Sequence, residues 1–260
     1  MIGAIIGDIV GSVYEFNNHR SKNFQFFTSK NFFTDDTVMT VAIAKALMES
    51  RGVGEVADNA VTEMQKWGRK YPYCGYGGRF SLWLREDKPQ PYGSFGNGAA
   101  MRVSPVGFFA KTLEECKALS QEVTKVTHNH KEGLKGAECV ACCVFLANNG
   151  HTKKELREFA EKYYNLDFTI DEIRNSYKFN ETCQQTVPQA LQAFFESADF
   201  EDAVRTAISV GGDSDTLAAI TGTIAEAYYG IPENLKNQAL GYLDNDLKTT
   251  VRDFYKSITT

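Results

Sequence analysis

Apolar residues recur along most of the chain at the three- and four-residue spacing of an α-helix. This spacing predicts helices over residues 1–15, 37–50, 54–70, 81–86, 112–126, 132–148, 152–163, 169–175, 183–198, 200–210, 216–229, 233–243 and 245–257. The alternating pattern of half-buried strands is scarce, and no repeat, low-complexity tract or linker divides the sequence. We therefore expect an all-α fold with a single domain over residues 1–260.

Two of these helices carry small residues at regular spacing. In the first helix, Gly3, Gly7 and Gly11 follow one another at intervals of four residues and share one side. Each glycine costs about 1 kcal/mol of helix stability relative to alanine, so the pattern needs a reason such as the close approach of a second helix. The helix predicted over 216–229 carries a comparable stripe, formed by Ala218, Gly222 and Ala225. Close helix packing is therefore expected at both stripes.

Paired acidic residues stand at the start of a C-terminal helix. The sequence GGDSDT places Gly211 and Gly212 before Asp213, Asp215 and Thr216. One Asp suffices to cap a helix, because its carboxylate accepts unpaired backbone N–H groups there. Two Asp and a Thr behind a flexible Gly-Gly turn can instead direct three oxygen atoms at one point. This stretch is a candidate cation site, provided that it has partners elsewhere in the chain.

A second acidic pair, Asp35 and Asp36 after Thr34, stands at the start of the helix predicted over 37–50. Helix capping explains either pair alone. Four carboxylates brought together would repel one another and would be costly to bury, whereas two divalent cations would neutralise them. A ligand set made only of oxygen atoms favours Mg²⁺ or Mn²⁺ over zinc. We therefore expect the two helix starts to face each other across one cleft.

A glycine-rich loop over 93–102, with the sequence GSFGNGAAMR, is a candidate anion cradle. Its glycines allow close approach of the backbone to a ligand, and successive N–H groups can surround a phosphate. The loop lacks the Gly-Lys-Ser/Thr of a Walker loop and the preceding strand of a dinucleotide-binding motif, so a simple turn is the alternative. Two of the four histidines form a cluster in THNH at 127–130, where His128 can hydrogen-bond a ligand or serve in the core or on the surface.

Two acidic residues belong to the first predicted helix. Asp8 and Glu15 are seven residues apart, which places them near one helical face, two turns from each other. The segment 16–34 that follows is polar and studded with phenylalanines, and it lacks helical spacing. A loop of this length in a compact domain is usually functional or disordered.

Composition bounds the partners and the compartment. A net charge of −5 gives no overall attraction to nucleic acid or acidic membranes, so an anionic ligand would have to bind locally. The apolar N-terminus contains Asp8 and has no Lys or Arg before Arg20, which argues against a signal peptide and a membrane span. We expect a cytoplasmic monomer that binds neither nucleic acid nor membranes. The six cysteines fit reduced thiols, and Cys139 and Cys142 lack a second pair at zinc spacing, which favours core packing.

Together these motifs resemble the ADP-ribosylglycohydrolase family over nearly the whole chain. The matching segments, in the family's order, are GAIIGDIVGSVYE, FTDDT, GYGGRF, YGSFGNGAAMRVSPVG, THNH, VPQALQAFFES and GGDSDTLAAITGTIAEAYYG. The resemblance implies a compact orthogonal bundle of helices with two Mg²⁺ or Mn²⁺ ions in a central cleft. Ser214 stands where many members have Thr, and the chain is shorter than several relatives, which leaves the identity of the acceptor open.

The resemblance also implies roles for individual residues. By motif position, the metal ligands would be Thr34, Asp35, Asp36, Asp213, Asp215 and Thr216. Glu15 matches a glutamate near the metals and the scissile bond, and His128 matches a histidine that contacts the ligand. The segment that holds pyrophosphate and adenosine would be formed by Tyr92, Gly93, Ser94, Phe95, Gly96, Asn97 and Gly98, with Phe95 stacked on adenine.

The implied activity is hydrolysis of the glycosidic bond between ADP-ribose and an acceptor, either an ADP-ribosylated protein or a small ADP-ribosyl conjugate, with ADP-ribose as a product. Two cations can orient the ribose hydroxyls and activate water, and Glu15 or Asp36 would move the proton. A relative that binds ADP-ribose without turnover, or serves a structural role, is the alternative. Such a relative is expected to lose metal ligands, yet all six positions carry oxygen. A dimetal phosphohydrolase would leave Glu15 and the glycine-rich loop without specific roles.

Overall fold

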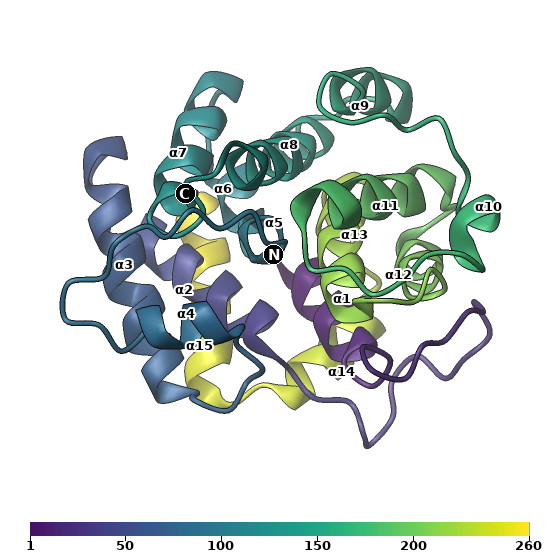
Figure 1. Ribbon diagram of the computed structural model, residues 1–260, viewed down its shortest axis with the longest axis horizontal. Coiled ribbons are helices and arrows are strands. Elements are labelled where there is room, and N and C mark those ends of the chain that lie inside the picture. The colour runs from purple at the N-terminus through teal and green to yellow at the C-terminus, as the bar shows by residue number, and fades with distance from the viewer. Residues whose placement is uncertain (260) are drawn as a thin grey trace.

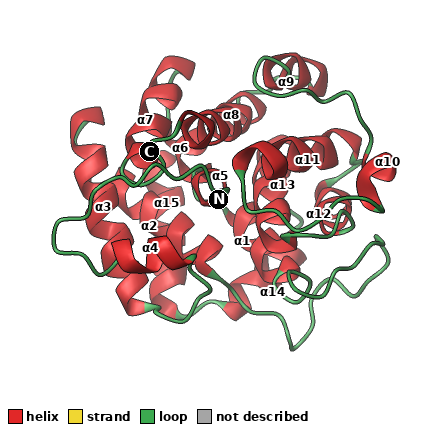
Figure 2. Ribbon diagram, in the orientation of Figure 1, coloured by secondary structure: helices red, strands yellow, loops and turns green. Residues whose placement is uncertain are grey.

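Residues 1–259 are described in the computed structural model of the chain, and most of them lie in helices (Figure 1) (Figure 2). The helices of this part of the chain are α1 (Ile2–Gly11), α2 (Asp35–Glu49), α3 (Val53–Lys70), α4 (Gly78–Trp83), α5 (Gly98–Met101), α6 (Ser104–Phe109), α7 (Leu113–Lys125), α8 (Lys131–Asn148), α9 (Lys153–Ala160), α10 (Ile170–Arg174), α11 (Cys183–Glu196), α12 (Phe200–Ile208), α13 (Ser214–Tyr229), α14 (Glu233–Tyr242) and α15 (Asn245–Ile258). Among these residues, strand-like pairing is limited to an isolated bridge between Gly96 and Thr182. The predicted all-α fold is confirmed.

The arrangement centres on α13. This helix packs against α1, α8, α11 and α12, and its residues from Ser214 to Ala225 are buried. Its apolar and small residues suit contact on all sides, and the buried hydroxyl of Thr221 donates to the carbonyl of Ala190 at 2.9 Å. Neighbouring helices therefore hold α13, whose N-terminal end carries the acidic motif, in a fixed position.

The two stripes of small residues meet at the crossing of α1 and α13. A Cβ atom added at Gly3 would lie 2.1 Å from the carbonyl oxygen of Gly222, and one added at Gly7 would lie 2.1 Å from that of Ala218. At Gly11 it would lie 2.4 Å from the Cα atom of Asp215. The expected close packing is therefore confirmed, and it brings α1 against the backbone of the acidic motif.

The helix that carries the other acidic pair belongs to a different part of the molecule. α2 packs against α1, α3 and α15. In Figure 1, α2, α3 and α15 lie on one side and α9 to α12 on the other, with α1 and α13 between them. The starts of α2 and α13 can therefore approach each other only along the seam between these two groups of helices.

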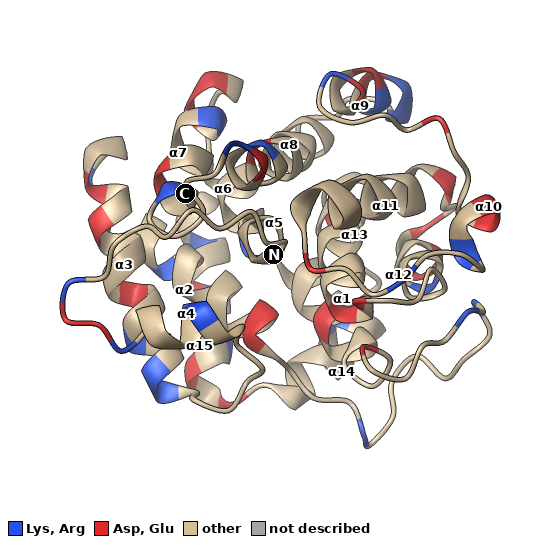
Figure 3. Cartoon of the chain, viewed as in Figure 1, with Lys and Arg blue, Asp and Glu red and all other residues tan. Residues whose placement is uncertain are grey.

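The outer helices are charged and the cysteines are internal. Figure 3 shows basic and acidic residues side by side on α9 and α10. Cys139 and Cys142 are buried in α8 and form no disulfide, so the prediction that they pack in the core is confirmed. Within the described chain, none of the helices has the length and apolar character needed to cross a membrane.

The predicted first helix is too long. α1 ends at Gly11, because the hydroxyl of Ser12 and the amide of Asn31 donate to the carbonyl of Ile9 at 2.9 and 2.8 Å. Glu15 therefore lies in the turn after α1 and does not share a helical face with Asp8. The turn, rather than helical periodicity, places Glu15 at the site described below.

Two short helices were not predicted. α5 and α6 occupy residues that the composition assigns to a glycine-rich loop and the segment after it. Each has only one or two turns, which are too few for a helical spacing of apolar residues to be recognised in the sequence. Pro105 lies in the first turn of α6, a position that proline tolerates.

Candidate active site

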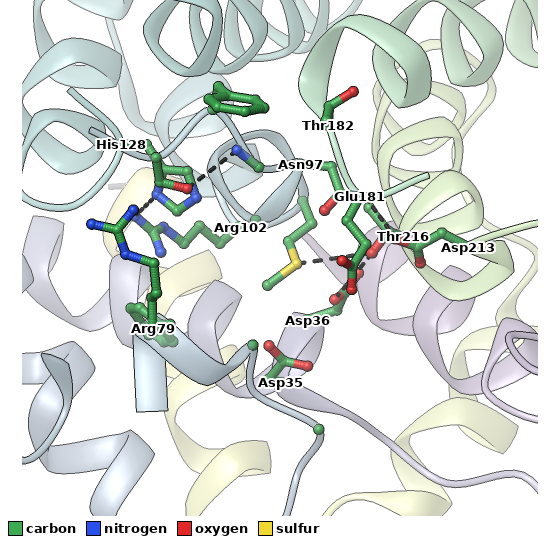
Figure 4. A pocket seen from close by; sticks show the side chains of 18 of the residues that line it. Asp35, Asp36, Arg79, Asn97, Arg102, His128, Glu181, Thr182, Asp213 and Thr216 are labelled. Carbon is green, nitrogen blue, oxygen red and sulfur yellow. Dashed lines mark hydrogen bonds between the residues drawn. The ribbon is translucent and has the colours of Figure 1, made fainter. Parts of the chain in front are cut away.

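The first turns of α2 and α13 meet at a cavity of about 400 Å³ (Figure 4). Its acidic end is lined by Asp35, Asp36, Asp213, Asp215 and Thr216. The hydroxyl of Thr216 donates to Oδ1 of Asp36 at 3.4 Å across the seam. The predicted meeting of the two helix starts is therefore confirmed.

The Gly-Gly turn and an asparagine set the direction of the α13 motif. Gly211 and Gly212 adopt φ angles of 76° and 75°, a region that glycine occupies without strain. The side-chain amide of Asn97 donates to Oδ2 of Asp213 at 2.6 Å, and the N–H of Thr216 donates to Oδ1 of Asp215 at 2.9 Å. The carboxylates of the motif are thus held by different groups and stand at fixed positions.

Asp8 lies beneath the α2 motif, and its role there was not predicted. Its carboxylate accepts hydrogen bonds from the N–H groups of Thr34 and Thr37 at 2.9 and 3.1 Å and from both hydroxyls. Thr34 is buried on this side and does not line the cavity. Its hydroxyl donates to Asp8 and accepts from the N–H of Asp36 at 3.3 Å, which leaves one oxygen lone pair for contact with a cation. Periodicity cannot reveal Asp8, because its partners lie 26 and 29 residues away.

The acidic end of the cavity is electrostatically unfavourable without a counter-charge. Burial, and then the neighbouring carboxylates, raise the pKa of Asp35, Asp36 and Asp215 well above the usual range. Within the described chain, the buried Oδ2 atom of Asp36 has no hydrogen-bond partner. Oxygen ligands, excess negative charge and an unpaired carboxylate oxygen all fit divalent cations of the Mg²⁺ or Mn²⁺ type.

Glu15 lies at the edge of the same cluster. One carboxylate oxygen each from Glu15, Asp213 and Asp215 lie within 4.8 Å of one another, a separation compatible with a shared cation. Desolvation, followed by the charges of Asp213, Asp8 and Glu181, raises the pKa of Glu15 to about 7. Glu15 is half-buried and lines the cavity, so it can exchange protons with a bound ligand or water near neutral pH.

The loop from Tyr92 to Gly98 forms the opposite wall of the cavity. Part of its backbone is already paired, since the N–H groups of Gly93, Gly96 and Asn97 donate to Asn129, Ser94 and Glu181. The N–H groups of Ser94, Phe95 and Gly98 have no acceptor among residues 1–259. The loop is thus a smaller anion cradle than the glycine pattern suggests, with its conformation fixed from behind.

Aromatic and basic groups complete this wall. The ring of Phe95 is 43% exposed and lies 5.2 Å from that of His130, so one of its faces is open to a ligand. The guanidinium of Arg79 lies 4.7 Å from the centre of the Tyr92 ring, and Arg79 also donates to the carbonyl of Tyr92 at 2.8 Å. The cavity is therefore acidic at one end and basic and aromatic at the other.

Several lining residues were not predicted from the sequence. The cavity is also lined by Gly75, Gly77, Gly78, Arg79, Phe80, Met101, Arg102, Glu181 and Thr182. Arg79 comes from the first turn of α4 and Glu181 from the loop before α11, and no pattern marks Glu181. The segments GYGGRF and GSFGNGAAMR already contain some of these residues, so the motifs were found although the roles of these side chains were not.

Comparisons with known proteins agree on one family. The family model described as ADP-ribosylglycohydrolase matches residues 1–260. "ADP-ribosylhydrolase ARH3" of Homo sapiens is 25% identical and aligns with 99% of this chain and 93% of its own length. "ADP-ribosyl-[dinitrogen reductase] glycohydrolase" of Rhodospirillum rubrum is 27% identical over 96% of this chain and 91% of its own. "ADP-ribosylarginine hydrolase Tri1" of Pseudomonas putida (strain GB-1) is 26% identical over 89% of this chain and 70% of its own length.

A solved structure shares the fold. The "ADP-ribosylglycohydrolase-related protein complex" superposes with a TM-score of 0.66 at 24% identity and covers 93% of this chain and 95% of its own. The alignment with the human relative extends over 339 positions, more than the 260 residues of this chain, so that relative contains insertions. The fold is shared, whereas some segments differ in length.

Proposed function

Because the chain belongs to the ADP-ribosylglycohydrolase family, we propose that it is a metal-dependent hydrolase that releases ADP-ribose from an ADP-ribosylated protein or a small ADP-ribosyl conjugate. The observation that carries this proposal is the single cavity with two chemically different ends. Opposed carboxylates occupy one end, and a glycine-rich loop with an open aromatic face occupies the other. A nucleoside diphosphate joined to a ribose has the same division between an anionic, aromatic part and a polyhydroxyl part.

The acidic end suits two divalent cations of the Mg²⁺ or Mn²⁺ type. The groups that would hold them are Thr34, Asp35, Asp36, Asp213, Asp215 and Thr216. When bound, such cations would supply charge that orients ribose hydroxyls and makes water more acidic. Asn97 and Asp8 fix Asp213 and the start of α2 from outside this set, so the ligands keep their places before any substrate arrives.

Glu15 is the proposed proton-transfer group. A water molecule attacks the anomeric carbon of the ribose, a carbon–oxygen bond forms, and the bond to the acceptor atom breaks. Glu15 takes one proton from the water, and the departing acceptor atom takes up a proton from solvent, so that one water molecule is divided between the two products. The pKa of Glu15 suits this exchange, since burial and neighbouring carboxylates raise it to about 7. Asp36 is the second choice, because its Oδ2 atom has no partner among the described residues.

The loop would bind the remainder of the ligand. The N–H groups of Ser94, Phe95 and Gly98 are free to donate to phosphate oxygens, and His128 lies beside them. The exposed ring of Phe95 offers a stacking surface for adenine. This assignment gives roles to Tyr92, Gly93, Ser94, Phe95, Gly96, Asn97, Gly98 and His128 as a single substrate-binding wall.

The test is single-turnover release of ADP-ribose with and without Mg²⁺, from ADP-ribosyl-arginine, ADP-ribosyl-serine and O-acetyl-ADP-ribose. We expect release from at least one conjugate, lost on chelation. Asp215→Asn should reduce the rate by at least 100-fold, because it removes a ligand charge at the centre of the cluster. Binding of ADP-ribose without release from any of the three would instead support the non-catalytic alternative. Wild-type rates from Asp215→Asn or from chelated protein would refute the metal role.

A further inference from the structure

The segment 127–130 lies behind the glycine-rich loop, and two of its residues have visible structural tasks. The Oδ1 atom of Asn129 accepts from the N–H of Gly93 at 2.7 Å and fixes the start of the loop. The Nδ1 atom of His130 accepts from the N–H of Glu132 at 3.2 Å and caps α8. The carbonyl of Thr127 also holds the loop, since it accepts from the N–H of Tyr92 at 3.3 Å, but the buried side chains of Thr127 and His128 have no comparable task.

The side chain of Thr127 lies between His128 and the buried guanidinium of Arg102. The Nη2 group of Arg102 donates to the hydroxyl of Thr127 at 2.7 Å, and this hydroxyl lies 2.7 Å from Nδ1 of His128. Arg102 is only 1% exposed and lines the cavity, and no carboxylate of residues 1–259 forms an ion pair with it. Burial lowers the pKa of Arg102 to about 10, so the side chain still carries its charge at neutral pH.

This chain of contacts determines where the imidazole proton lies. A guanidinium can only donate, so the Thr127 oxygen accepts from Arg102. The hydroxyl proton of Thr127 then has one nearby acceptor, Nδ1 of His128. A proton on Nδ1 would leave the hydroxyl hydrogen without an acceptor and would face Nη2 of Arg102, which lies only 3.5 Å from Nδ1. In the neutral ring, the proton is therefore on Nε2.

Nε2 is the end of the ring that faces the loop. A Cβ atom added at Gly96 or at Gly98 would lie 3.5 Å from Nε2, so both glycines border this atom. No group in residues 1–259 hydrogen-bonds to Nε2, although His128 as a whole is only 5% exposed. A buried ring therefore presents an unpaired N–H beside the free N–H groups of Ser94, Phe95 and Gly98. Every donor at this point suits the same kind of ligand, an oxyanion.

We propose that Arg102 and Thr127 are positioning residues that hold His128 in the Nε2–H form, so that its ring donates a hydrogen bond to a phosphate oxygen. The opposite tautomer would present a lone pair and repel the same oxygen. The charge of Arg102, which lines the same cavity, adds attraction for the anion. The identity of the ligand, a diphosphate, rests on the proposed function, whereas the tautomer is a property of the protein alone.

The tautomer can be measured without any ligand, in protein labelled with ¹⁵N-histidine. A long-range ¹H–¹⁵N correlation spectrum distinguishes protonated from unprotonated ring nitrogens, and loss of one set of signals in His128→Gln assigns the residue. We expect an unprotonated Nδ1 and a protonated Nε2 in the wild type. Thr127→Val removes the hydroxyl and should shift His128 towards a mixture of tautomers, while Thr127→Ser retains the wild-type pattern. A protonated Nδ1 in the wild type would overturn the proposal.

Thr124→Val is the matched control. Thr124 lies one turn earlier and is equally buried, and its hydroxyl has no partner within the described residues. The same change of side chain there removes no link to His128, so the tautomer and the affinities below should stay as in the wild type. An effect of Thr124→Val equal to that of Thr127→Val would show that packing, rather than the relay, is responsible.

Calorimetric titration with ADP-ribose, inorganic pyrophosphate and adenosine then tests the consequence. Thr127→Val should bind ADP-ribose and pyrophosphate about tenfold more weakly, which corresponds to one weakened hydrogen bond to a charged group. Its affinity for adenosine, which has no phosphate, should not change. Unchanged ADP-ribose affinity, or equal losses for all three ligands, would refute the positioning role. If the wild type bound pyrophosphate but not ADP-ribose, the proposed function would fail while the assignment of His128 would stand.

Discussion

At the scale of single residues, Asp8 illustrates how a group that never touches the cavity can determine its chemistry. Its buried carboxylate accepts from two N–H groups and two hydroxyls at the start of α2. In the unfolded chain, the N–H groups and hydroxyls of Thr34 and Thr37 would bind water, and in the folded protein the Asp8 carboxylate replaces that water. Since Asp35 and Asp36 lie between these two threonines, Asp8 holds the backbone that directs both carboxylates into the cavity.

The substitution Asp8→Asn should therefore weaken cation binding. An amide group turns one acceptor oxygen into a donor, which opposes the Thr34 hydroxyl and disturbs the start of α2. We expect the affinity for Mg²⁺ to fall about 10- to 100-fold, as is typical when a group that orients ligands is removed. Calorimetric titration with Mg²⁺ measures this.

Glu63→Gln provides the control for Asp8→Asn. The Glu63 carboxylate is also buried, but it accepts from Trp67 within α3, away from the cavity. The Glu63→Gln variant should leave the affinity for Mg²⁺ unchanged, even if it lowers the free energy of unfolding. Equal Mg²⁺ affinities for Asp8→Asn and the wild type would show that the start of α2 keeps its position without this carboxylate.

Substitution of Glu15 should slow the chemical step but leave ADP-ribose binding nearly unchanged. Glu15→Gln keeps the size of the side chain but cannot accept a proton, so kcat should fall about 100- to 10,000-fold. ADP-ribose affinity should change little, because the glycine-rich loop is intact. Single-turnover rates and titration with ADP-ribose, compared with those of Glu181→Gln, measure both effects. Glu181 lines the same cavity and adds the smallest of the charge effects that raise the pKa of Glu15, but it is not one of the three carboxylates whose oxygens lie within 4.8 Å of one another. A similar loss of rate in Glu181→Gln would contradict a special role for Glu15.

At the scale of helices, the crossing of α1 and α13 links the fold to the site. The backbones of Gly7 and Ala218 are so close that no side chain fits between them. The next contact along the same stripe joins Gly11 to Asp215. Displacing one helix from the other would therefore move the acidic motif directly, without any change in its own residues.

Gly7→Ala tests this link. The new methyl group would lie 2.1 Å from the carbonyl oxygen of Ala218, so the helices must separate, at a cost of about 1–3 kcal/mol or more in unfolding free energy. Urea denaturation measures that loss, and a parallel Mg²⁺ titration should show weaker binding.

The matched control is Gly241→Ala in α14, where a Cβ atom meets nothing within 4 Å. It should be neutral or stabilising by up to about 1 kcal/mol, because alanine is the better helix former. If Gly7→Ala behaved like Gly241→Ala, the packing of α1 against α13 would be looser than the structure shows.

Sequence patterns predict helices better than they predict helix ends. Nearly every long helix was predicted because buried faces repeat over several turns, as in α8 and α13. α1 was extended too far because its end depends on Asn31, which comes from a distant loop, rather than on a local stop signal. α5 and α6 were missed because one or two turns contain too few positions for a repeat.

At the scale of the whole molecule, the site could be predicted where its chemistry lies in short motifs. Both acidic pairs and the loop from Tyr92 to Gly98 are visible as local clusters, and the structure brings them to one cavity. Arg102 belongs to the predicted cradle, but its role was not predicted, and Glu181 was missed because isolated charged residues are common on surfaces; only folding shows how these two line the cavity. Local sequence therefore reveals the groups that act together in pairs, whereas tertiary contacts reveal those that support them.

The clustering of carboxylates makes the stability of the whole molecule depend on pH and cations together. The folded-state pKa values of Asp35, Asp36 and Asp215 lie well above their ordinary values, and that of Glu15 is about 7. The folded protein therefore keeps protons that the unfolded chain releases above about pH 4. Ionising these groups costs stability, so the contribution of Glu15 falls as the pH rises from about 4 to 7, and those of the three aspartates fall as the pH rises through their raised pKa values. Cations bind only the ionised carboxylates, so the stabilisation that they provide increases as the pH rises.

We predict that the rise in Tm on adding Mg²⁺ is small at pH 5.5 and grows to about 5–10 °C at pH 8, the range given by a cation present at about 100 times its Kd. Scanning calorimetry in EDTA and in Mg²⁺ at each pH measures this difference. Titratable groups outside the cluster are present in both samples, so their effects cancel. Asp215→Asn should show a smaller rise that depends less on pH. A rise in the wild type that is equal at pH 5.5 and pH 8 would mean that protons and cations do not compete for these carboxylates, and the cations would then have to bind elsewhere.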